Sequence, residues 1–184
     1  MTTVFIAGSR NIKHLDHKIK ERIDNIYALN FDVIVGDADG VDASVQAYLF
    51  EKAFCNAVIY YSGSQTRNNI GNWPTYKVET DLEPGSRAFF TAKDVKMAEA
   101  GDYGLMIWDT KSTGTLSNVI ELLKRNKKTV LFINKIKEFR TISDISHLED
   151  LIMCMSESAR SKADQKMKLY QQLNDLKHKQ IRMF

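Results

Sequence analysis

The sequence predicts an α/β fold, with a doubly wound, mainly parallel sheet covered by helices on both faces and a C-terminal helical extension. Short apolar runs alternate with longer segments of helical periodicity along the first 134 of the 184 residues. These runs are nearly continuous rather than alternating, which is typical of parallel strands buried on both faces. Polar segments containing glycine follow several of the runs, as strand-to-helix turns require. Right-handed crossovers between such strands make the arrangement Rossmann-like.

Five apolar runs are expected to form the strands of the sheet. They cover residues 4–7, 32–35, 58–61, 105–108 and 129–133. Their lengths and their content of branched and aromatic side chains match buried strands.

Helical spacing fills most of the intervals between these runs. Residues 13–29 and 41–54 place apolar side chains three or four positions apart, the period of one helix face. A third helix is expected from Thr91, which with Asp94 has the spacing of a capping box. A fourth is expected to begin at Gly114.

The chain is expected to divide into a Rossmann-like domain, residues 1–134, and a helical extension, residues 135–184. Residues 156–182 contain neither Gly nor Pro and are predicted to form one long helix. The apolar positions that can share one face of this helix are Leu169, Leu173, Leu176 and Met183. Either the parent domain or a second copy must cover this stripe, and a homodimer is expected because twofold dimers are the commonest closed assembly. A nucleic-acid or membrane-surface helix is the alternative, disfavoured because the basic residues are interspersed with acidic ones.

Composition limits the class of protein. Hydrophobic residues make up 43% and charged residues 27%, which excludes collagen, disordered tails and disulfide scaffolds. The net charge of +3 is too small to indicate a nucleic-acid binder, so nucleic acid is not an expected partner. Cys55 and Cys154 have no metal-ligand spacing, and no apolar run is long enough to cross a membrane. Without a recognisable signal peptide, the sequence predicts a cytoplasmic protein with no membrane partner, metal site or cofactor.

Residues that can bind an anion follow the first strand. Gly8 permits close approach of the backbone, the Ser9 hydroxyl can hold an anion, and Arg10 adds a bidentate donor. Ligands of open parallel sheets bind beyond the carboxyl ends of the strands, where these residues are expected. A plain strand-to-helix turn with a solvated arginine is the alternative.

Three carboxylates cluster after the second strand. Behind Gly36, the residues Asp37, Asp39 and Asp42 could accept from ribose hydroxyls, bind a cation or act as a base. A local turn and a favourable first helical turn would explain some of them without a function.

The segment after the fourth strand has the features of a phosphate site. Asp109 is followed by Ser112, Thr113, Gly114 and Thr115 directly before a helix. Free amides and hydroxyls at the positive end of a helix dipole suit a phosphate, although a plain N-cap needs only one of these residues. The Walker A motif and the G-x-G-x-x-G fingerprint are absent, which argues against a Walker-type ATPase and an ordinary dehydrogenase.

A long polar stretch, residues 62–86, is predicted to be a functional or disordered loop. Arg67, and Arg87 just beyond it, could bind phosphates, and Trp73 and Tyr76 could contact a nucleobase. A solvated loop with Trp73 packed against the domain is the alternative.

These motifs, taken in order, resemble the SLOG superfamily over roughly residues 3–134. The segments that carry the resemblance are Ile6-Ala7-Gly8-Ser9-Arg10, Gly36-Asp37-Ala38-Asp39-Gly40-Val41-Asp42, Arg87 with Lys93-Asp94, Trp108-Asp109 and Ser112-Thr113-Gly114-Thr115. The superfamily includes the LOG, or lysine-decarboxylase-like, phosphoribohydrolases, the DprA/Smf proteins and the YspA-type proteins, of which the last look most similar. The resemblance implies a Rossmann-like fold that binds a nucleotide or a nucleotide-derived ligand, and LOG-type relatives raise the expectation of a dimer.

The sequence departs from the LOG pattern at the catalytic position. In the LOG motif P-G-G-x-G-T-x-x-E, Gly114 and Thr115 match, but the glutamate position is occupied by Asn118. An amide cannot act as a carboxylate base, and Glu121 is an imperfectly placed substitute.

Three functions therefore remain open. The main hypothesis is a module that binds a nucleotide or an ADP-ribose-like ligand at the carboxyl end of the sheet. The first alternative is a hydrolase that cleaves the N-glycosidic bond of a nucleoside phosphate, with Asp37, Asp39, Asp42 or Glu121 in catalytic roles. The second is a nucleic-acid-associated protein like DprA.

Overall fold

The computed structural model describes residues 1–181, which form one sheet with the strand order β4-β3-β2-β1-β5-β6-β7. The strands are β1 (Thr3–Gly8), β2 (Asp32–Gly36), β3 (Ala57–Tyr61), β4 (Thr75–Lys77), β5 (Tyr103–Trp108), β6 (Thr129–Ile133) and β7 (Glu138–Ile142). Neighbouring strands pair in parallel except β6 and β7, which are antiparallel. The predicted mainly parallel, Rossmann-like α/β fold is confirmed.

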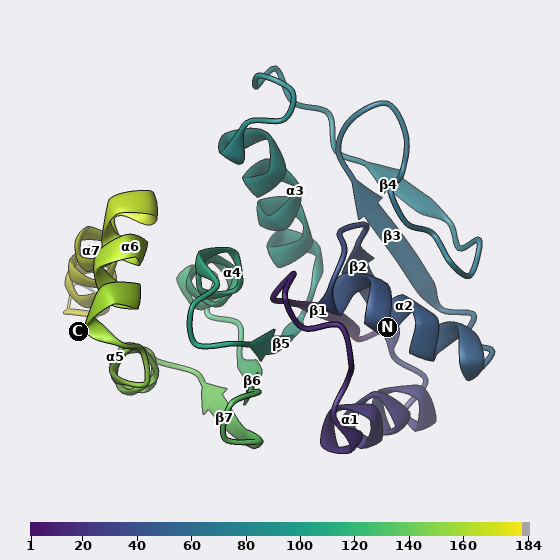
Figure 1. Ribbon diagram of the computed structural model, residues 1–184, viewed down its shortest axis with the longest axis horizontal. Coiled ribbons are helices and arrows are strands. Elements are labelled where there is room, and N and C mark those ends of the chain that lie inside the picture. The colour runs from purple at the N-terminus through teal and green to yellow at the C-terminus, as the bar shows by residue number, and fades with distance from the viewer. Residues whose placement is uncertain (182–184) are drawn as a thin grey trace.

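Helices cover both faces of this sheet (Figure 1). They are α1 (His17–Ala28), α2 (Val41–Glu51), α3 (Arg87–Ala100), α4 (Thr113–Lys124), α5 (Ile145–Met153), α6 (Glu157–Met167) and α7 (Leu169–Ile181). Successive strand residues point to opposite faces, so Ile6 joins the apolar core under α1 and α2, whereas Phe5 joins the core under α3 and α4. The helices of the extension pack into this second core.

The strand order creates a switch point at the centre of the sheet. From β1 the chain winds outward through β2, β3 and β4, and then returns to β5 on the other side of β1. The segment after β1 leads to α1 on one face, and the segment after β5 leads to α4 on the opposite face. Because these connections diverge, a crevice opens beyond the carboxyl ends of β1 and β5, where doubly wound folds bind ligands.

Two edge strands were absent from the sequence-based prediction. The three residues of β4 are all exposed, and β7 carries charged, mostly exposed side chains, so neither gives an apolar run. Since β7 pairs with β6, the expected division at residue 134 falls inside a hairpin of one sheet.

The expected single helix over 156–182 is wrong, because the chain turns between α6 and α7. Lys168 adopts a left-handed backbone conformation, with φ 53°, and ends α6. The Asp164 carboxylate accepts a hydrogen bond from the backbone N–H of Tyr170 at 3.1 Å and so links the two helices. The two helices form a hairpin that packs against the sheet domain.

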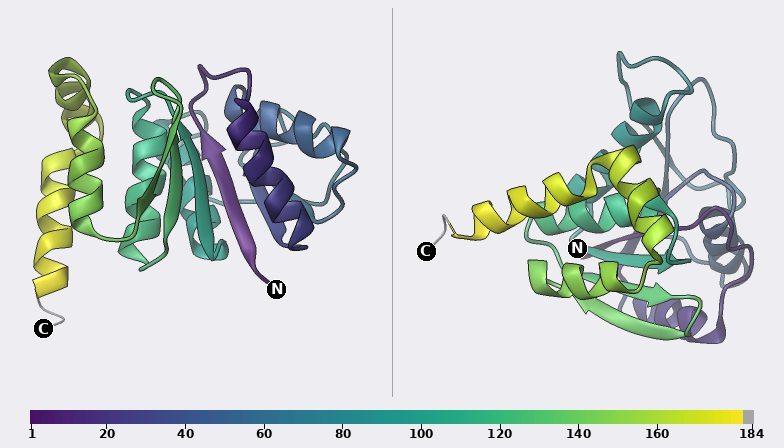
Figure 2. Two further views of the ribbon diagram at one scale, coloured as in Figure 1. Left: turned by 90° about the horizontal axis from the view of Figure 1, so that it is seen from below. Right: turned by 60° about the vertical axis from the view of Figure 1, so that its left-hand side comes forward.

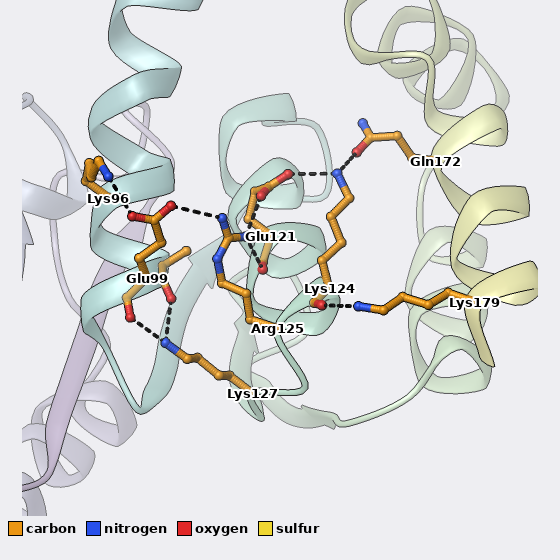
Figure 3. A network of polar contacts seen from close by, with 9 residues as sticks. Lys96, Glu99, Glu121, Lys124, Arg125, Lys127, Gln172 and Lys179 are labelled. Atoms are coloured by element: carbon orange, nitrogen blue, oxygen red, sulfur yellow. Dashed lines mark hydrogen bonds and ion pairs between the residues drawn. The ribbon is translucent and has the colours of Figure 1, made fainter. Parts of the chain in front are cut away.

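The apolar stripe of the extension is covered within the same chain. Leu169, Leu173 and Leu176 are buried in the core shared with α4, and Met183 lies outside the described residues. Figure 3 shows polar contacts across the same boundary, where Lys124 Nζ donates to Gln172 Oε1 at 2.8 Å. The homodimer was predicted mainly because this stripe needed a cover, and the structure covers it without a second copy. The homodimer therefore stays a prediction without that argument.

None of the helices described over residues 1–181 is both long enough and apolar enough to cross a membrane.

Candidate functional site

A large, open cavity lies at the switch point of the sheet. Its volume is about 1310 Å³. Its walls come from the segments after β1, β2 and β5, from α2, α3 and the first two turns of α4, and from single residues of α1 and α6. The predicted site residues that line it are Gly8, Ser9, Arg10, Asp39, Asp42, Arg67, Asp109, Ser112, Thr113, Gly114, Thr115 and Asn118. The structure thus brings together residues more than 100 positions apart in the chain.

Ser9 and Asp109 join the segments that follow β1 and β5. The buried Ser9 hydroxyl donates to Asp109 Oδ2 at 2.6 Å, and Asp109 Oδ1 accepts from the backbone N–H groups of Ser112 and Lys111. Although burial raises the pKa of Asp109, these hydrogen bonds outweigh it and hold the pKa below its ordinary value. Ser9 and Asp109 therefore fix the shape of the cavity floor, and the Ser9 hydroxyl is already engaged within the protein.

The requirement for glycine at position 8 is structural. A Cβ there would collide with the Ile107 carbonyl oxygen and the Val41 side chain. This close packing, rather than the expected approach of a ligand, explains why the position holds no side chain.

The first turn of α4 offers unoccupied donors to the cavity. Ser112 caps the helix by accepting from the N–H of Thr115, while the N–H groups of Thr113 and Gly114 precede any intrahelical acceptor. A Cβ at Gly114 would meet no atom within 4 Å, so the backbone there faces open space. This turn has the geometry of an anion site.

Asn118 lies one turn further along α4, in the wall of the same cavity. The residue is buried, and its Oδ1 atom has no hydrogen-bond partner in the described part of the chain. Because an unpaired buried acceptor is costly, a ligand group that donates to it would gain affinity.

A buried ion-pair cluster supports the wall formed after β2. Asp37 is fully buried and is held by Arg67, with an NH2–Oδ1 distance of 2.6 Å, and by Lys93, with an Nζ–Oδ1 distance of 3.1 Å. Burial raises the pKa of Asp37, but the Arg67 hydrogen bonds and the Lys93 charge outweigh it and lower the pKa overall. Asp37 does not line the cavity, so it positions Arg67 and Lys93 rather than facing a ligand.

Gly36 permits the close approach of this cluster. A Cβ at Gly36 would collide with Asp42 Oδ2 and Lys93 Nζ. The residue thus serves packing beneath the cavity and does not line it.

Two carboxyl groups in the cavity have raised pKa values. Removal from water raises the pKa of Asp42 to about 6, against the opposing charge of Lys93. The same cause raises the pKa of Asp94 to about 7, with Lys93 again opposing and Asp42 adding repulsion. Each group can gain or lose a proton near neutral pH, which is a property of acid–base residues in active sites. Asp39, by contrast, is exposed and accepts from Asn68 Nδ2 at 3.1 Å.

Besides Gly36 and Asp37, two further predicted site residues lie outside the cavity wall. Arg87 donates to Thr113 Oγ1 at 3.4 Å and so touches the edge of the site from α3. Glu121 is directed away and pairs with Lys124 at 2.8 Å and with Arg125 at 2.6 Å (Figure 3). The substitution of Glu121 for the missing LOG glutamate therefore has no support in the geometry.

The sequence reasoning missed further residues of the site. Phe90 lines the cavity, is 37% exposed, and lies with its ring 5.1 Å from the Arg67 guanidinium carbon. Gln46 is buried and holds the segment after β3 through two hydrogen bonds. Its Nε2 donates to the Asn68 carbonyl, and its Oε1 accepts from the backbone N–H of Ile70. Trp73, which the sequence suggests as a contact for a nucleobase, is buried and donates to Phe54 O at 2.7 Å, so it packs against the domain as in the alternative interpretation.

Comparison with known proteins gives one informative match. No family model and no curated protein matches the sequence. Among solved structures, the chain is similar to DNA processing protein A from Helicobacter pylori, with a TM-score of 0.55 and 15% identity. The match covers 91% of this chain and 80% of that chain, and that structure is described as showing a single-stranded DNA binding mode. At this identity the likeness shows a shared fold alone, and no match supports the YspA-type assignment.

This match corrects the expectation that excluded nucleic acid as a partner. The exclusion depended on the net charge of +3 for the whole chain. A protein of the same fold binds single-stranded DNA, so the net charge of the chain does not justify the exclusion. Local charge matters more: Arg10, Lys13, Lys20 and Lys111 all line this one cavity.

Proposed function

We propose that this chain binds single-stranded nucleic acid and holds one nucleotide unit of the strand in the cavity. The phosphate is bound by the N–H groups of Thr113 and Gly114, at the positive end of the α4 dipole, with Arg10 as a charged donor. Backbone donors of this kind contact phosphate without regard to base sequence.

Phe90 and Asn118 provide contacts for the rest of the nucleotide. An exposed aromatic ring beside an arginine is a surface on which a base can stack. The unpaired Asn118 Oδ1 accepts a hydrogen bond from a sugar hydroxyl or a base N–H group. The observation that carries the proposal is that one open cavity holds both the free first turn of α4 and the Phe90 ring.

The size of the cavity favours a strand over a free mononucleotide. Its volume of about 1310 Å³ exceeds the roughly 300–1,000 Å³ that encloses a small ligand. The likeness of the fold to a protein that binds single-stranded DNA supports the same choice.

The first test places a bulky side chain at Gly114. A Cβ at Gly114 meets no atom within 4 Å, so we expect Gly114→Val to be accommodated and its side chain to cover the N–H groups offered to phosphate. We expect fluorescence anisotropy with an oligothymidylate of about 20 nucleotides to show at least a tenfold loss of affinity at unchanged melting temperature. Ser146→Val, at the equivalent exposed position of α5, is the matched control. Wild-type protein that binds AMP or ADP-ribose in a thermal-shift assay, but no oligonucleotide, would contradict the proposal.

A second candidate function is hydrolysis of the N-glycosidic bond of a nucleoside phosphate, favoured by the raised pKa values of Asp42 and Asp94 in the cavity. In this reaction a water oxygen bonds to C1′ while Asp42 takes its proton. The bond from C1′ to the base breaks, and protonated Asp94 gives its proton to the departing nitrogen.

The test of this candidate is product analysis. Chromatography of nucleoside monophosphates incubated with the protein should show free base, and Asp94→Asn should lower the rate more than the affinity. Absence of free base after prolonged incubation rules this candidate out.

A further inference from the structure

The C-terminal extension reaches the same end of the molecule as the cavity. Figure 2 shows α6 lying across the end toward which the arrows of the parallel strands point, whereas α7 runs back toward the other end. Lys166, in the last turn of α6, lines the cavity together with Thr113 and Gly114 of α4. The extension thus contributes a cation to a site that is otherwise built by the α/β core.

Lys166 belongs to a group of cations without acidic partners. Lys162 precedes it by one helical turn and Lys168 follows in the turn to α7, and all three side chains are exposed. None of the ion pairs within residues 1–181 includes these lysines, whereas Lys177 of α7 pairs with Glu149 at 2.5 Å. The nearby Asp164 carboxylate accepts the backbone N–H of Tyr170 instead. The three ammonium groups are therefore available to an external anion.

Tyr170 adds an exposed aromatic ring to this group. Its exposed fraction is 53%, and it follows directly on the turn made by the left-handed Lys168. An exposed tyrosine among lysines gives a base a face for stacking and gives its neighbouring phosphates positive charge. Base pairs of a duplex do not offer a free base face, so this combination fits an unpaired strand.

We propose that Lys162, Lys166, Lys168 and Tyr170, here named the α6 surface, form a second contact region for single-stranded nucleic acid. The inference rests on the proposed function, because the α6 surface begins at the cavity that holds the first nucleotide. The strand continues from the α4 N-terminus over Lys166, with its phosphates along the lysines and one base on Tyr170. The extension then determines the minimum strand length required for full affinity.

The test compares two variants with matched controls on oligothymidylates of about 4 and about 20 nucleotides. The double variant Lys162→Gln/Lys168→Gln removes two phosphate contacts outside the cavity, and Lys96→Gln/Lys128→Gln removes two lysines near the amino ends of the strands. We expect the α6 variant to bind the long strand more weakly and to lower the slope of log affinity against log salt by about 1.4, because each single-strand contact contributes about 0.7. Affinity for the short strand and the melting temperature should not change.

A second pair of variants tests stacking. Tyr170→Ala should weaken binding of the long strand about five- to 150-fold, which corresponds to the loss of one stacked base. Tyr103→Ala, at a tyrosine of similar exposure at the amino end of β5, should leave the affinity unchanged.

The outcomes separate the two proposals. Wild-type protein that binds neither oligonucleotide overturns the proposed function itself. Wild-type protein that binds the long strand, with the α6 variants indistinguishable from their controls, overturns only the α6 surface. Polyglutamate that displaces the long strand as effectively as an unlabelled oligonucleotide overturns the choice of nucleic acid as partner.

Discussion

At the scale of single residues, the site contains a group of carboxylates and cations in which one carboxylate is well paired and two are not. Asp37 is surrounded by Arg67 and Lys93, and its charge is stabilised. Asp42 and Asp94 lie at the edge of the same group and share Lys93, and their partial removal from water disfavours the charged forms. The cavity therefore keeps carboxyl groups that weaken the folded state at neutral pH, as expected where function and stability compete.

This imbalance predicts the pH dependence of stability at Asp94. The pKa of Asp94 is about 7 in the folded protein against a model value of 3.8, so the folded state binds more protons between these values and loses stability as pH rises. Asp94→Asn does not titrate, and it should therefore be more stable than wild type by up to about 4 kcal/mol at about pH 8, with the difference vanishing below about pH 4. Urea unfolding across this range measures the difference, with Asp150→Asn, at an exposed carboxylate of α5, as the control. A variant less stable than wild type at every pH would contradict the assignment.

At the scale of elements, the sequence predicts what apolar periodicity encodes and misses what depends on contacts. The strands β1, β2, β3, β5 and β6 are buried on both faces and appear in the sequence as apolar runs. The edge strand β7 forms because it pairs with β6, and no local sequence pattern predicts this pairing. The capping-box spacing predicts that α3 begins at Thr91, but Ser86 caps the helix by accepting from the N–H of Phe89.

The same distinction holds for the elements of the site. The turn after β5 could be predicted, because Ser112, Thr113 and Gly114 are adjacent in sequence and begin a helix. Phe90 and Lys166 could not, because only the packing of α3 and α6 beside α4 brings them to the cavity. Similarly, the sequence does not show toward which side of α4 the Glu121 carboxylate points. In the structure it pairs with Arg125, away from the cavity.

At the scale of the whole molecule, the extension packs into the same apolar core as the helix α4. The core beneath α4 contains Leu116, Val119 and Ile120 together with Leu169 and Leu173 of α7. Polar contacts cross the same boundary, including the Lys179 ammonium, which donates to the Lys124 carbonyl at 2.8 Å (Figure 3). Removing the extension would therefore expose the outer side of a core helix.

This arrangement predicts that a chain ending at Cys154 is strongly destabilised. Truncation removes α6 and α7 and uncovers apolar side chains of α4, so we expect a lower melting temperature and association through the exposed face. Leu173→Ala, which deletes part of one contact in the full chain, should cost about 2–3 kcal/mol in urea unfolding. Light scattering and thermal melts of the truncated and full-length proteins measure both effects, and Tyr170→Ala provides an exposed control on the same helix. A truncated protein that stays monomeric and has the same melting temperature as the full chain would contradict this prediction. It would mean that α6 and α7 are not needed for the stability of the core, and that their role lies in binding.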